Sequence, residues 1–517
     1  MPDSEPPTAG DDDPSRDREG AVPGRLVDAR GSDAPHPDAA LAAWYLRDRH
    51  RRVWRLPITV ALVIFVAVLL VRGTADDPKA HLEASRAALL ALAPPDVPAA
   101  ENAALDYARA HKAKVAFPRA PGKQQWPDDP HVNVTKETAL LDFPQVHAYL
   151  ASNASAIQLL YAGAAKPRCN WGLNYALGPA IPMAHLASTR DSARLLAIHA
   201  RLAAHAGDHQ AAARSIAAIY RLADQCAVDP LLINGLVSVA CAAIADGTLE
   251  AIVTWDMPAS LDDLAAYRKA LWLDRRGWAR AARSLAAEKA FCLFILDSVT
   301  AGVIPAPVQA PGLGTGLEFL APDKGGAIWY GAERSCYVAV IDELVDRTAR
   351  GECLSEEQAK ALVAKHQAGP AIMTFTDMPV FTRCVLNFLA NEDRGVVTDA
   401  GLAFLQFRLK HGRDPKSLDE LVPEFLPAVP TGVFHPSPLR MKVDPEGVRV
   451  KDRKTGKVSH RDPGTIRVYT LGLNNTDDGG LNHIWDDELP APTLGDDVGF
   501  RVPPIRTSGP AAGGTQP

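Results

Sequence analysis

Oxygen-bearing side chains are concentrated in one stretch near the end of the chain, residues 472–488. Calcium binds about six to eight oxygen ligands, mostly carboxylates, amides and carbonyls. Gly479 and Gly480 allow the tight turn that brings such ligands together. The stretch therefore predicts a Ca²⁺ site, and a solvated Asx and Gly turn without an ion is the alternative. Its ligand-type residues are Asn474, Asn475, Asp477, Asp478, Asn482, Asp486, Asp487 and Glu488.

The spacing within this stretch does not follow an EF-hand. Asn474, Thr476 and Asp478 approximate the first ligand positions, but Trp485 stands where a bidentate glutamate is required. An extended segment, not a helix, is expected before the loop. A calcium site here would be of another kind.

A second chemically mixed stretch is Pro167 to Pro182, with the sequence PRCNWGLNYALGPAIP. Asn170 and Asn174 would supply polar contacts in a pocket, and Trp171 a flat platform. Such a pocket would suit an exported hydrolase. A buried turn between helices, with its amides hydrogen-bonded, is the other interpretation.

The histidines give only a weak indication of metal binding. His205 and His209 are four residues apart, a spacing that places two imidazoles together on one helix. Gly207 and Asp208 lie between them and predict a turn instead. We found no HExxH, GxSxG or P-loop pattern in the chain, so no familiar catalytic motif marks a reaction.

The seven cysteines include no CxxC pair, which removes the usual zinc and thioredoxin-like patterns. Cys241, Cys292 and Cys384 lie in apolar stretches and are expected to be buried thiols. Export of the chain would permit disulfides, and Cys336 with Cys353 is the candidate pair.

Helices must position most of these residues, because residues 79–409 are rich in Ala and Leu at helical spacing. The clearest case is a helical hairpin with its turn at Gly207 and Asp208. Leu195, Ile198 and Leu202 share one face before the turn, and Ile216, Ile219 and Ala223 share one after it. Two helix starts are also expected, at Ser260 with Asp263 and at Ser355 with Gln358.

The hairpin resembles a single tetratricopeptide-like unit. Ala200, Gly207, Ala212 and Ile216 fall near the small and apolar positions of that repeat. One copy cannot bury its own faces, so we expect a divergent helical array over residues 78–400. A Pro/Gly-rich loop, residues 302–326, interrupts it.

After Thr398 the pattern changes to a helix followed by strands. The helix is expected to end at Gly412, and Ser417 with Glu420 predicts a short capped turn. Residues 439–443 and 448–450 alternate around the turn 444–447 and predict a β-hairpin. Residues 466–470 predict a third strand, so this part is a small α+β domain.

This C-terminal part, residues 401–502, resembles the C-terminal region of major pseudopilins of type II secretion systems. The resemblance lies in the segments 411–415, 417–430 and 469–472 and in the acidic loop that follows. It departs from the family at Asp414 and at residues 431–434. That loop binds calcium in the family, and the resemblance implies structural Ca²⁺ with four ligands: the Leu471 carbonyl, Asp478, Asp486 and Asp487.

The expected cellular compartment of the protein depends on an apolar run, Leu56 to Val71, with the sequence LPITVALVIFVAVLLV. We take this run as the only stretch able to enter a bilayer. With its flanking residues it predicts a transmembrane helix at 56–72. A cleaved signal peptide is the alternative, because Gly73, Thr74 and Ala75 are small. About 55 residues precede the run, which favours an uncleaved anchor.

Charge gives the orientation. The basic segment 44–55 holds Arg47, Arg49, Arg51, Arg52 and Arg55, so the N-terminus is expected in the cytoplasm and the bulk outside the inner membrane. Residues 1–43 and 503–517 have the composition of disordered tails. A net charge of -6 and the lack of a basic domain argue against nucleic-acid binding.

The stretch from Cys169 to Tyr175, CNWGLNY, resembles one in a family of membrane-anchored bacterial proteins typical of planctomycetes. That resemblance implies an envelope location and no particular chemistry. We therefore expect a mainly α, non-enzymatic envelope protein, anchored by one helix and binding protein partners through its helical domain. An exported hydrolase with a pocket near Trp171 is the alternative.

Overall fold

The computed structural model describes residues 77–116, 141, 144–303, 327–367, 372–451, 458–480 and 496–505. These residues are mainly helical, with a small antiparallel sheet near the C-terminal end. The mainly α class is therefore confirmed. The apolar run Leu56 to Val71, the segments 1–43 and 44–55, most of the Pro/Gly-rich stretch and the side chains of Asp486 and Asp487 lie outside the described residues.

The helices follow one another through most of the chain. The first group is α2 (Pro78–Leu90), α3 (Ala103–Ala113), α5 (Pro144–Ser152), α6 (Ala154–Ala164), the 3-10 helix η2 (Tyr175–Ala180), α7 (Ala184–His205) and α8 (His209–Cys226). The second group is α9 (Leu232–Trp255), α10 (Leu261–Ala270), α11 (Gly277–Thr300), α12 (Ala327–Ala349), α13 (Glu356–His366), α14 (Ile372–His411) and the 3-10 helix η5 (Leu418–Leu421).

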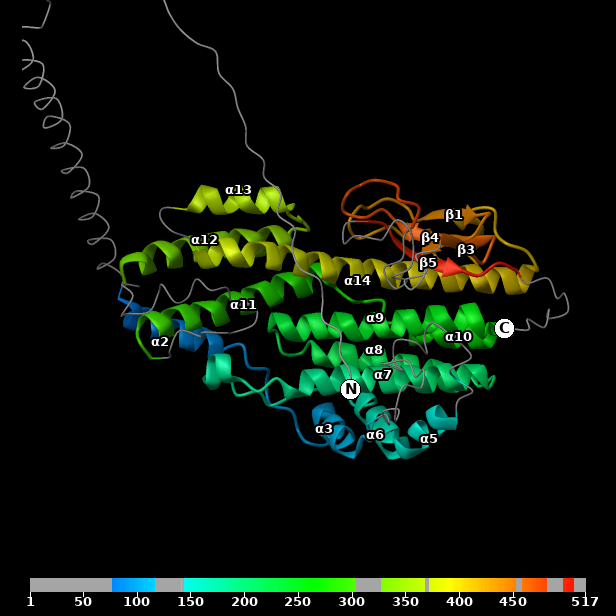
Figure 1. The fold of residues 1–517 in the computed structure, drawn as a ribbon, viewed down its shortest axis with the longest axis horizontal. Coiled ribbons are helices and arrows are strands. Elements are labelled where there is room, and N and C mark those ends of the chain that lie inside the picture. The colour runs from blue at the N-terminus through cyan, green and yellow to red at the C-terminus, as the bar shows by residue number, and fades with distance from the viewer. Residues whose placement is uncertain are drawn as a thin grey trace, which may run out of the picture. The chain divides into compact units, whose positions relative to one another are not determined.

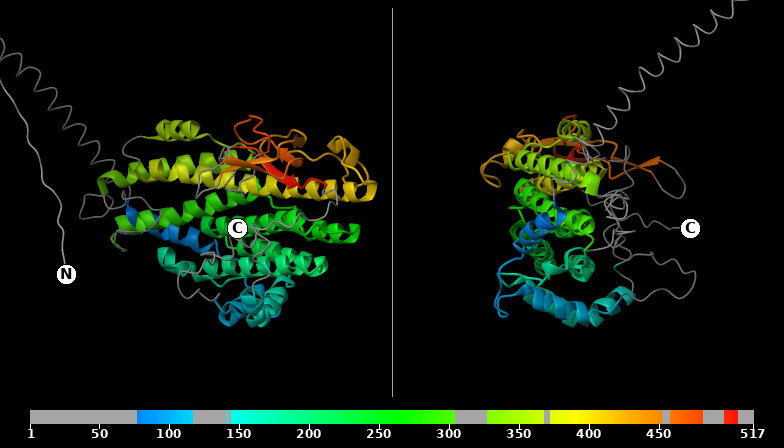
Figure 2. Two further views of the ribbon diagram at one scale, coloured as in Figure 1. Left: turned by 45° about the vertical axis from the view of Figure 1, so that its right-hand side comes forward. Right: turned by 90° about the vertical axis from the view of Figure 1, so that its left-hand side faces the viewer.

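The long helices lie in successive layers within the compact unit formed by residues 69–517 (Figure 1). α7 packs on α8, α8 on α9, and α9 on α14, while α11 contacts α2, α12 and α14. The short helices α3, α5 and α6 cover the side of α7 and α8 that faces away from α14, as both views of Figure 2 also show. The layers are held by apolar faces at helical spacing.

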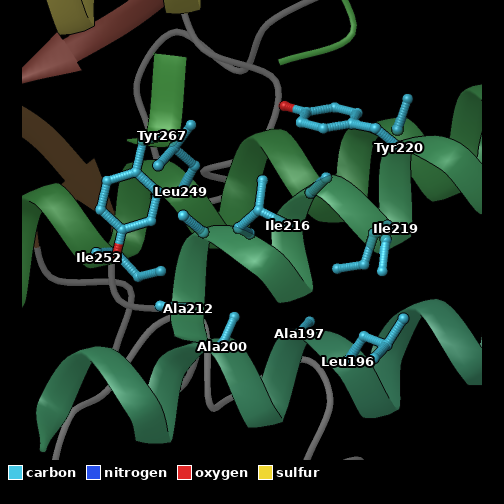
Figure 3. Close-up of a cluster of buried hydrophobic side chains, with 14 of the residues drawn as sticks. Leu196, Ala197, Ala200, Ala212, Ile216, Ile219, Tyr220, Leu249, Ile252 and Tyr267 are labelled. Atoms are coloured by element: carbon cyan, nitrogen blue, oxygen red, sulfur yellow. The ribbon is translucent and has the colours of Figure 1, made fainter. Parts of the chain in front are cut away.

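The predicted hairpin is confirmed as α7 and α8. Gly207 has a φ of 82°, a left-handed conformation that suits glycine at a helix end, and Asp208 caps α8 by accepting from the Ala211 N–H. Small residues let the two helices approach closely, and Ile216 and Ile219 fill the layer between them (Figure 3). No second repeat is needed to bury these faces, because α9 and α10 close the same core.

Both predicted helix starts are also present. Ser260 accepts from the Asp263 N–H, and Ser355 forms a full capping box with Gln358. Ser417 precedes η5 as expected, but it makes no side-chain cap. Its hydroxyl donates to the Asp419 carboxylate at 3.1 Å instead.

The helix α9 corrects one prediction. Within the described residues it too is long and apolar enough to cross a membrane, so the run at 56–71 is not the only such stretch. Its most apolar window is 67% buried against neighbouring helices. A core helix of a layered bundle is apolar all round for this reason.

The sheet differs from the expected hairpin. Its strands are β1 (Arg440–Asp444), β2 (Val448–Lys451), β3 (Val458–Arg461), β4 (Thr465–Thr470) and β5 (Val498–Val502). β1 and β5 flank β4, all antiparallel, while β2 pairs with β3. The predicted pairing of β1 with β2 is therefore wrong, although the turn exists, with Gly447 N–H donating to Asp444 O. Every residue of β4 is buried, so core packing selects it as the partner of β1.

α14 joins the helical layers to the sheet. It runs unbroken through residues 400 and 401, where we had placed a domain boundary. Side chains from β4 and β5 belong to the same apolar cluster as those of α7 to α10. A Cβ at Gly401 would overlap the Phe500 ring of β5, which shows how closely strand and helix approach. Helices and sheet therefore share one core.

The cysteines are all free in the structure. Cys241, Cys292 and Cys384 are buried thiols, as expected. The predicted bridge between Cys336 and Cys353 is absent. Cys336 belongs to the apolar core of α11, α12 and α14, and Cys353 packs on the edge of that core after α12 ends.

Candidate functional site

A pocket of about 360 Å³ lies among four elements: η2, α9, α11 and α14. Apolar side chains make most of its wall, among them Ile181, Leu232, Leu236, Phe291 and Phe381. A volume of this size, at the small end of the range for ligand pockets, and an apolar lining are typical of small-molecule sites. Two side chains depart from the apolar lining, Glu288 of α11 and Asp377 of α14.

The segment Pro167 to Pro182 supplies one wall of this pocket. Gly178 has a φ of 51° and lies against the Phe294 ring, where a Cβ would overlap it. That close approach lets Gly178, Pro179 and Ile181 border the cavity. The pocket is therefore at the far end of the segment from Trp171.

Trp171 itself is part of a packed turn. Its indole Nε1 donates to Gln225 O at 3.1 Å, and its ring lies 5.8 Å from Tyr107 and 4.9 Å from His185. Asn170 accepts from Gly172 N–H and donates to Pro95 O, and Asn174 caps η2. These contacts confirm a turn with satisfied amides, but the turn is not buried, because Asn170 and Trp171 are half-buried and Asn174 is exposed. Trp171 does not line the pocket.

Asp377 is the least satisfied of the pocket's polar groups. Only 4% of the residue is exposed, and among the described residues its Oδ2 has no hydrogen-bond partner. Glu288 is half-buried and weakly bonded, with Leu232 N–H at 3.4 Å from Oε2 and the Cys292 thiol at 3.9 Å from Oε1. No Lys, Arg or His occurs among the described residues that line the pocket.

The surroundings raise the pKa of both carboxyl groups. Burial raises the pKa of Glu288 to about 7, and the weak bonds from Leu232 and Cys292 oppose this only in part. Burial raises the pKa of Asp377 to about 7 as well, and the charges of Glu288 and Glu333 add to the rise. Glu333 is held beside them because Thr374 donates to its Oε1 from N–H at 2.9 Å and from Oγ1 at 2.8 Å.

The rim of the pocket is apolar and exposed. Ile233 is 47% exposed and Val380 is 49% exposed, and both border the opening. Leu177 on η2, next to the bordering Gly178, is 45% exposed. A group of solvent-exposed apolar side chains around a cavity marks a binding surface more often than single exposed apolar side chains do.

A second pocket of about 420 Å³ lies between the C-terminal ends of α9 and α14 and residues 503–505. Its charged residue is Arg408, which pairs with Asp414 and donates to Pro503 O. The Arg408 charge is thus paired within the protein, although its Nη2 has no hydrogen-bond partner among the described residues.

The predicted calcium ligands are placed only in part. Leu471 is buried beside the sheet, and Asp478 is half-buried with its Oδ2 accepting from Asn474 Nδ2 at 2.9 Å. Asp486 and Asp487 lie outside the described residues. Within the described chain, no three His, Cys, Asp or Glu side chains are grouped in a way that would hold a metal ion.

Asp497, just before β5, contacts this loop and was not singled out by the sequence. It is fully buried and accepts backbone N–H groups from Gly472 at 3.1 Å, Asp478 at 2.8 Å and Gly480 at 3.2 Å. Burial raises its pKa, and the three N–H donors lower it in opposition. Because Asp497 lies beyond the acidic stretch and beside a second aspartate, Asp496, nothing in the pattern marked it as the anchor of the loop.

His205 and His209 do not face one another as a metal pair. His205 bonds to Asp256 at 2.9 Å, whereas His209 bonds to the Tyr267 hydroxyl at 3.0 Å. The turn at Gly207 separates them, as expected.

The chain matches no protein-family model, and no curated protein or solved structure is significantly similar to it. The resemblances to pseudopilins and to planctomycete-type membrane-anchored proteins therefore stay predictions.

Proposed function

We propose that the chain is a single-pass, membrane-anchored envelope protein whose helical domain binds ligands and partners without catalysing a reaction. The observation that carries the binding role is the apolar pocket with its exposed apolar rim, formed by η2, α9, α11 and α14. Layered helices suit this role because a cavity between packed helices keeps its shape without a ligand.

The pocket can be tested with a fluorescent apolar probe on the full chain in lipid nanodiscs. Leu236→Trp adds bulk inside the cavity and should abolish saturable binding. Leu105→Trp is the matched control, because Leu105 is 45% exposed on α3 and does not line the pocket. Equal binding by both variants would contradict the proposal.

The anchor rests on sequence alone. Leu56 to Val71 would span the inner membrane with the N-terminus in the cytoplasm. We expect the full chain to resist carbonate extraction and a variant lacking 56–72 to be released. Protease added outside the inner membrane should digest residues after 72 and spare the N-terminal tail. Protection of the bulk would reverse the orientation, and release of the full chain would remove the anchor.

Calcium is part of the same proposal as a structural cofactor of the C-terminal loop. Asp478, Asp486 and Asp487 would supply carboxylate oxygens and Leu471 a carbonyl oxygen, as the pseudopilin resemblance implies. Neutralising clustered carboxylates would stabilise the loop that Asp497 anchors from its buried side.

An exported hydrolase is the second candidate function. The raised pKa values of Glu288 and Asp377 favour it. A carboxyl with a pKa near 7 can act as general acid or general base at neutral pH. A screen of ester, amide and glycoside substrates separates the two functions. Turnover that disappears in Glu288→Gln or Asp377→Asn would establish the hydrolase and overturn the non-enzymatic proposal.

A further inference from the structure

We infer that the pocket recognises a small apolar molecule carrying one ammonium group, which binds between the carboxyl groups of Glu288 and Asp377. The inference rests on the proposed binding function and names the class of ligand. It is carried by the two acidic residues in an otherwise apolar lining, one of which, Asp377, has an Oδ2 without a donor among the described residues.

The charge balance of the pocket points to a cation. Its two carboxyl groups face a lining that contains, within the described chain, no basic side chain. Another fully buried acid, Asp246, is paired with Arg275 through bonds of 2.7 and 2.8 Å. An ammonium ligand would give Asp377 and Glu288 the counter-charge that Arg275 gives Asp246. Its N–H groups would donate to the carboxylate oxygens.

The rest of the lining decides what kind of cation fits. A calcium or magnesium ion needs about six oxygen ligands, and the described lining offers only the oxygens of two carboxyl groups besides backbone. Ile181, Leu236 and Phe381 would bury hydrocarbon instead. The exposed Ile233 and Val380 extend this apolar surface to the rim. An amine on a hydrocarbon or aromatic body is complementary both to the two carboxyl groups and to the apolar lining.

The test compares two probes of equal shape on the full chain in nanodiscs at pH 8: 3-phenylpropylamine and the neutral 3-phenylpropanol. Calorimetry should show the amine binding at least about tenfold more tightly than the alcohol, because only the ammonium pairs with the buried carboxylates. Asp377→Asn and Glu288→Gln should each weaken amine binding about tenfold or more and leave alcohol binding within about twofold. Glu83→Gln, at an exposed carboxyl of α2, should change neither.

The outcomes separate the ammonium inference from the proposed apolar binding site. Amine and alcohol binding with equal affinity, both blocked by Leu236→Trp, would overturn the ammonium inference and leave the apolar binding site standing. Failure of both probes to bind would overturn the inference together with the pocket's role. Circular dichroism of each variant confirms that it is folded, and removing an unpaired buried charge is not expected to unfold the chain.

Discussion

Buried carboxylates in this protein divide according to what they contact. Asp246 meets Arg275 and the Tyr220 hydroxyl, and Asp497 meets three backbone N–H groups. Asp377 has the charges of two other acids, Glu288 and Glu333, near enough to raise its pKa. A buried charge without a counter-charge costs free energy, so proteins keep such groups mainly where they serve a ligand or a reaction. This contrast is why we place function at Asp377.

The first prediction concerns Asp377 and pH. Its pKa rises from about 4 in the unfolded chain to about 7 in the folded one. Between these values the native state holds a proton that the unfolded state has lost, so stability falls as pH rises through this window. Asp377→Asn removes the effect, and we expect it to raise the free energy of unfolding by about 2 kcal/mol at pH 8. At pH 4 the gain should vanish.

Denaturant unfolding at the two pH values measures this difference. Glu288 on α11 and Glu333 on α12 both raise the pKa of Asp377, and the Cys292 thiol and the Tyr337 hydroxyl also interact with its charge. A gain in Asp377→Asn that is equal at pH 4 and pH 8 would refute the titration account.

Histidines produce the opposite slope. Burial lowers the pKa of His111 and of His185 to about 4, and Lys114 contributes to the shift at His111. Their folded forms stay neutral while the unfolded chain takes up protons below about pH 6.5, so stability is lost as pH falls from there toward 4. His111→Phe keeps a ring beside Trp171 and should reduce this acid sensitivity. His147→Phe, at an exposed position of α5, should not.

Residue chemistry of this kind was only partly predictable. The turn at Asn170, Trp171 and Asn174 was one of two interpretations of a stretch whose mixture of amides and aromatics also suited a pocket. Glu288 and Asp377 did not stand out, because single acids in helical stretches carry no motif. They are 89 positions apart in the chain and meet only through the packing of α11 on α14. An acid inside an otherwise apolar helical face was the one signal available.

Among the elements, α14 has the largest structural role. The helix starts at Ser260 and Ser355 were predicted correctly, because a cap depends on neighbours within one turn, whereas the expected cap at Ser417 is absent. The strand pairing was not predicted correctly. β1 pairs with β4 because β4 packs in the core, and the local turn after β1 does not determine this pairing. α14 was divided at 400 because the change of pattern there reflects a new packing partner, the sheet, and not the end of the helix.

The contact between α14 and β5 gives an element-scale prediction. Gly401→Ala should destabilise the protein by about 1 kcal/mol net, because overpacking against Phe500 costs about 1–3 kcal/mol. The usual helix gain from glycine to alanine, about 1 kcal/mol, opposes it. Phe500→Leu removes the clashing ring atoms. The double variant should therefore lose less stability than the sum of the single losses, by about 1 kcal/mol in chemical denaturation. Simple additivity would show that the helix and strand are not in contact there.

The acidic loop gives another prediction. Saturating Ca²⁺ should raise the melting temperature of the full chain, since an ion that binds only the folded state stabilises it. Asp478→Ala and Asp486→Ala should each remove this effect, whereas Thr476→Ala, in the same loop, should keep it. A melting temperature that does not respond to Ca²⁺ in the unmodified chain would remove calcium and favour the solvated turn.

At the scale of the whole molecule, composition and periodicity predicted the mainly helical class and the small sheet. They did not predict that both share a core. Apolar spacing identifies which face of an element is buried, but the identity of the element that covers it depends on contacts between distant segments. Val468 of β4 and Ile216 of α8 belong to one cluster although more than 250 residues separate them.

That shared core predicts cooperative unfolding of helices and sheet together. If residues 78–505 unfold as one unit, amides in α8 and in β4 should exchange hydrogen only through the same global opening. Ile216→Ala leaves a cavity in the layer between α7, α8 and α9 and should cost about 2–4 kcal/mol. Mass spectrometry of hydrogen exchange should then show protection falling equally in both elements.

Gly401→Ala, made at the sheet, should lower protection in α8 by the same amount as in β4. If β4 kept its protection in Ile216→Ala while α8 lost it, the sheet would be an independent domain. The shared core would then hold the parts together without coupling their stability.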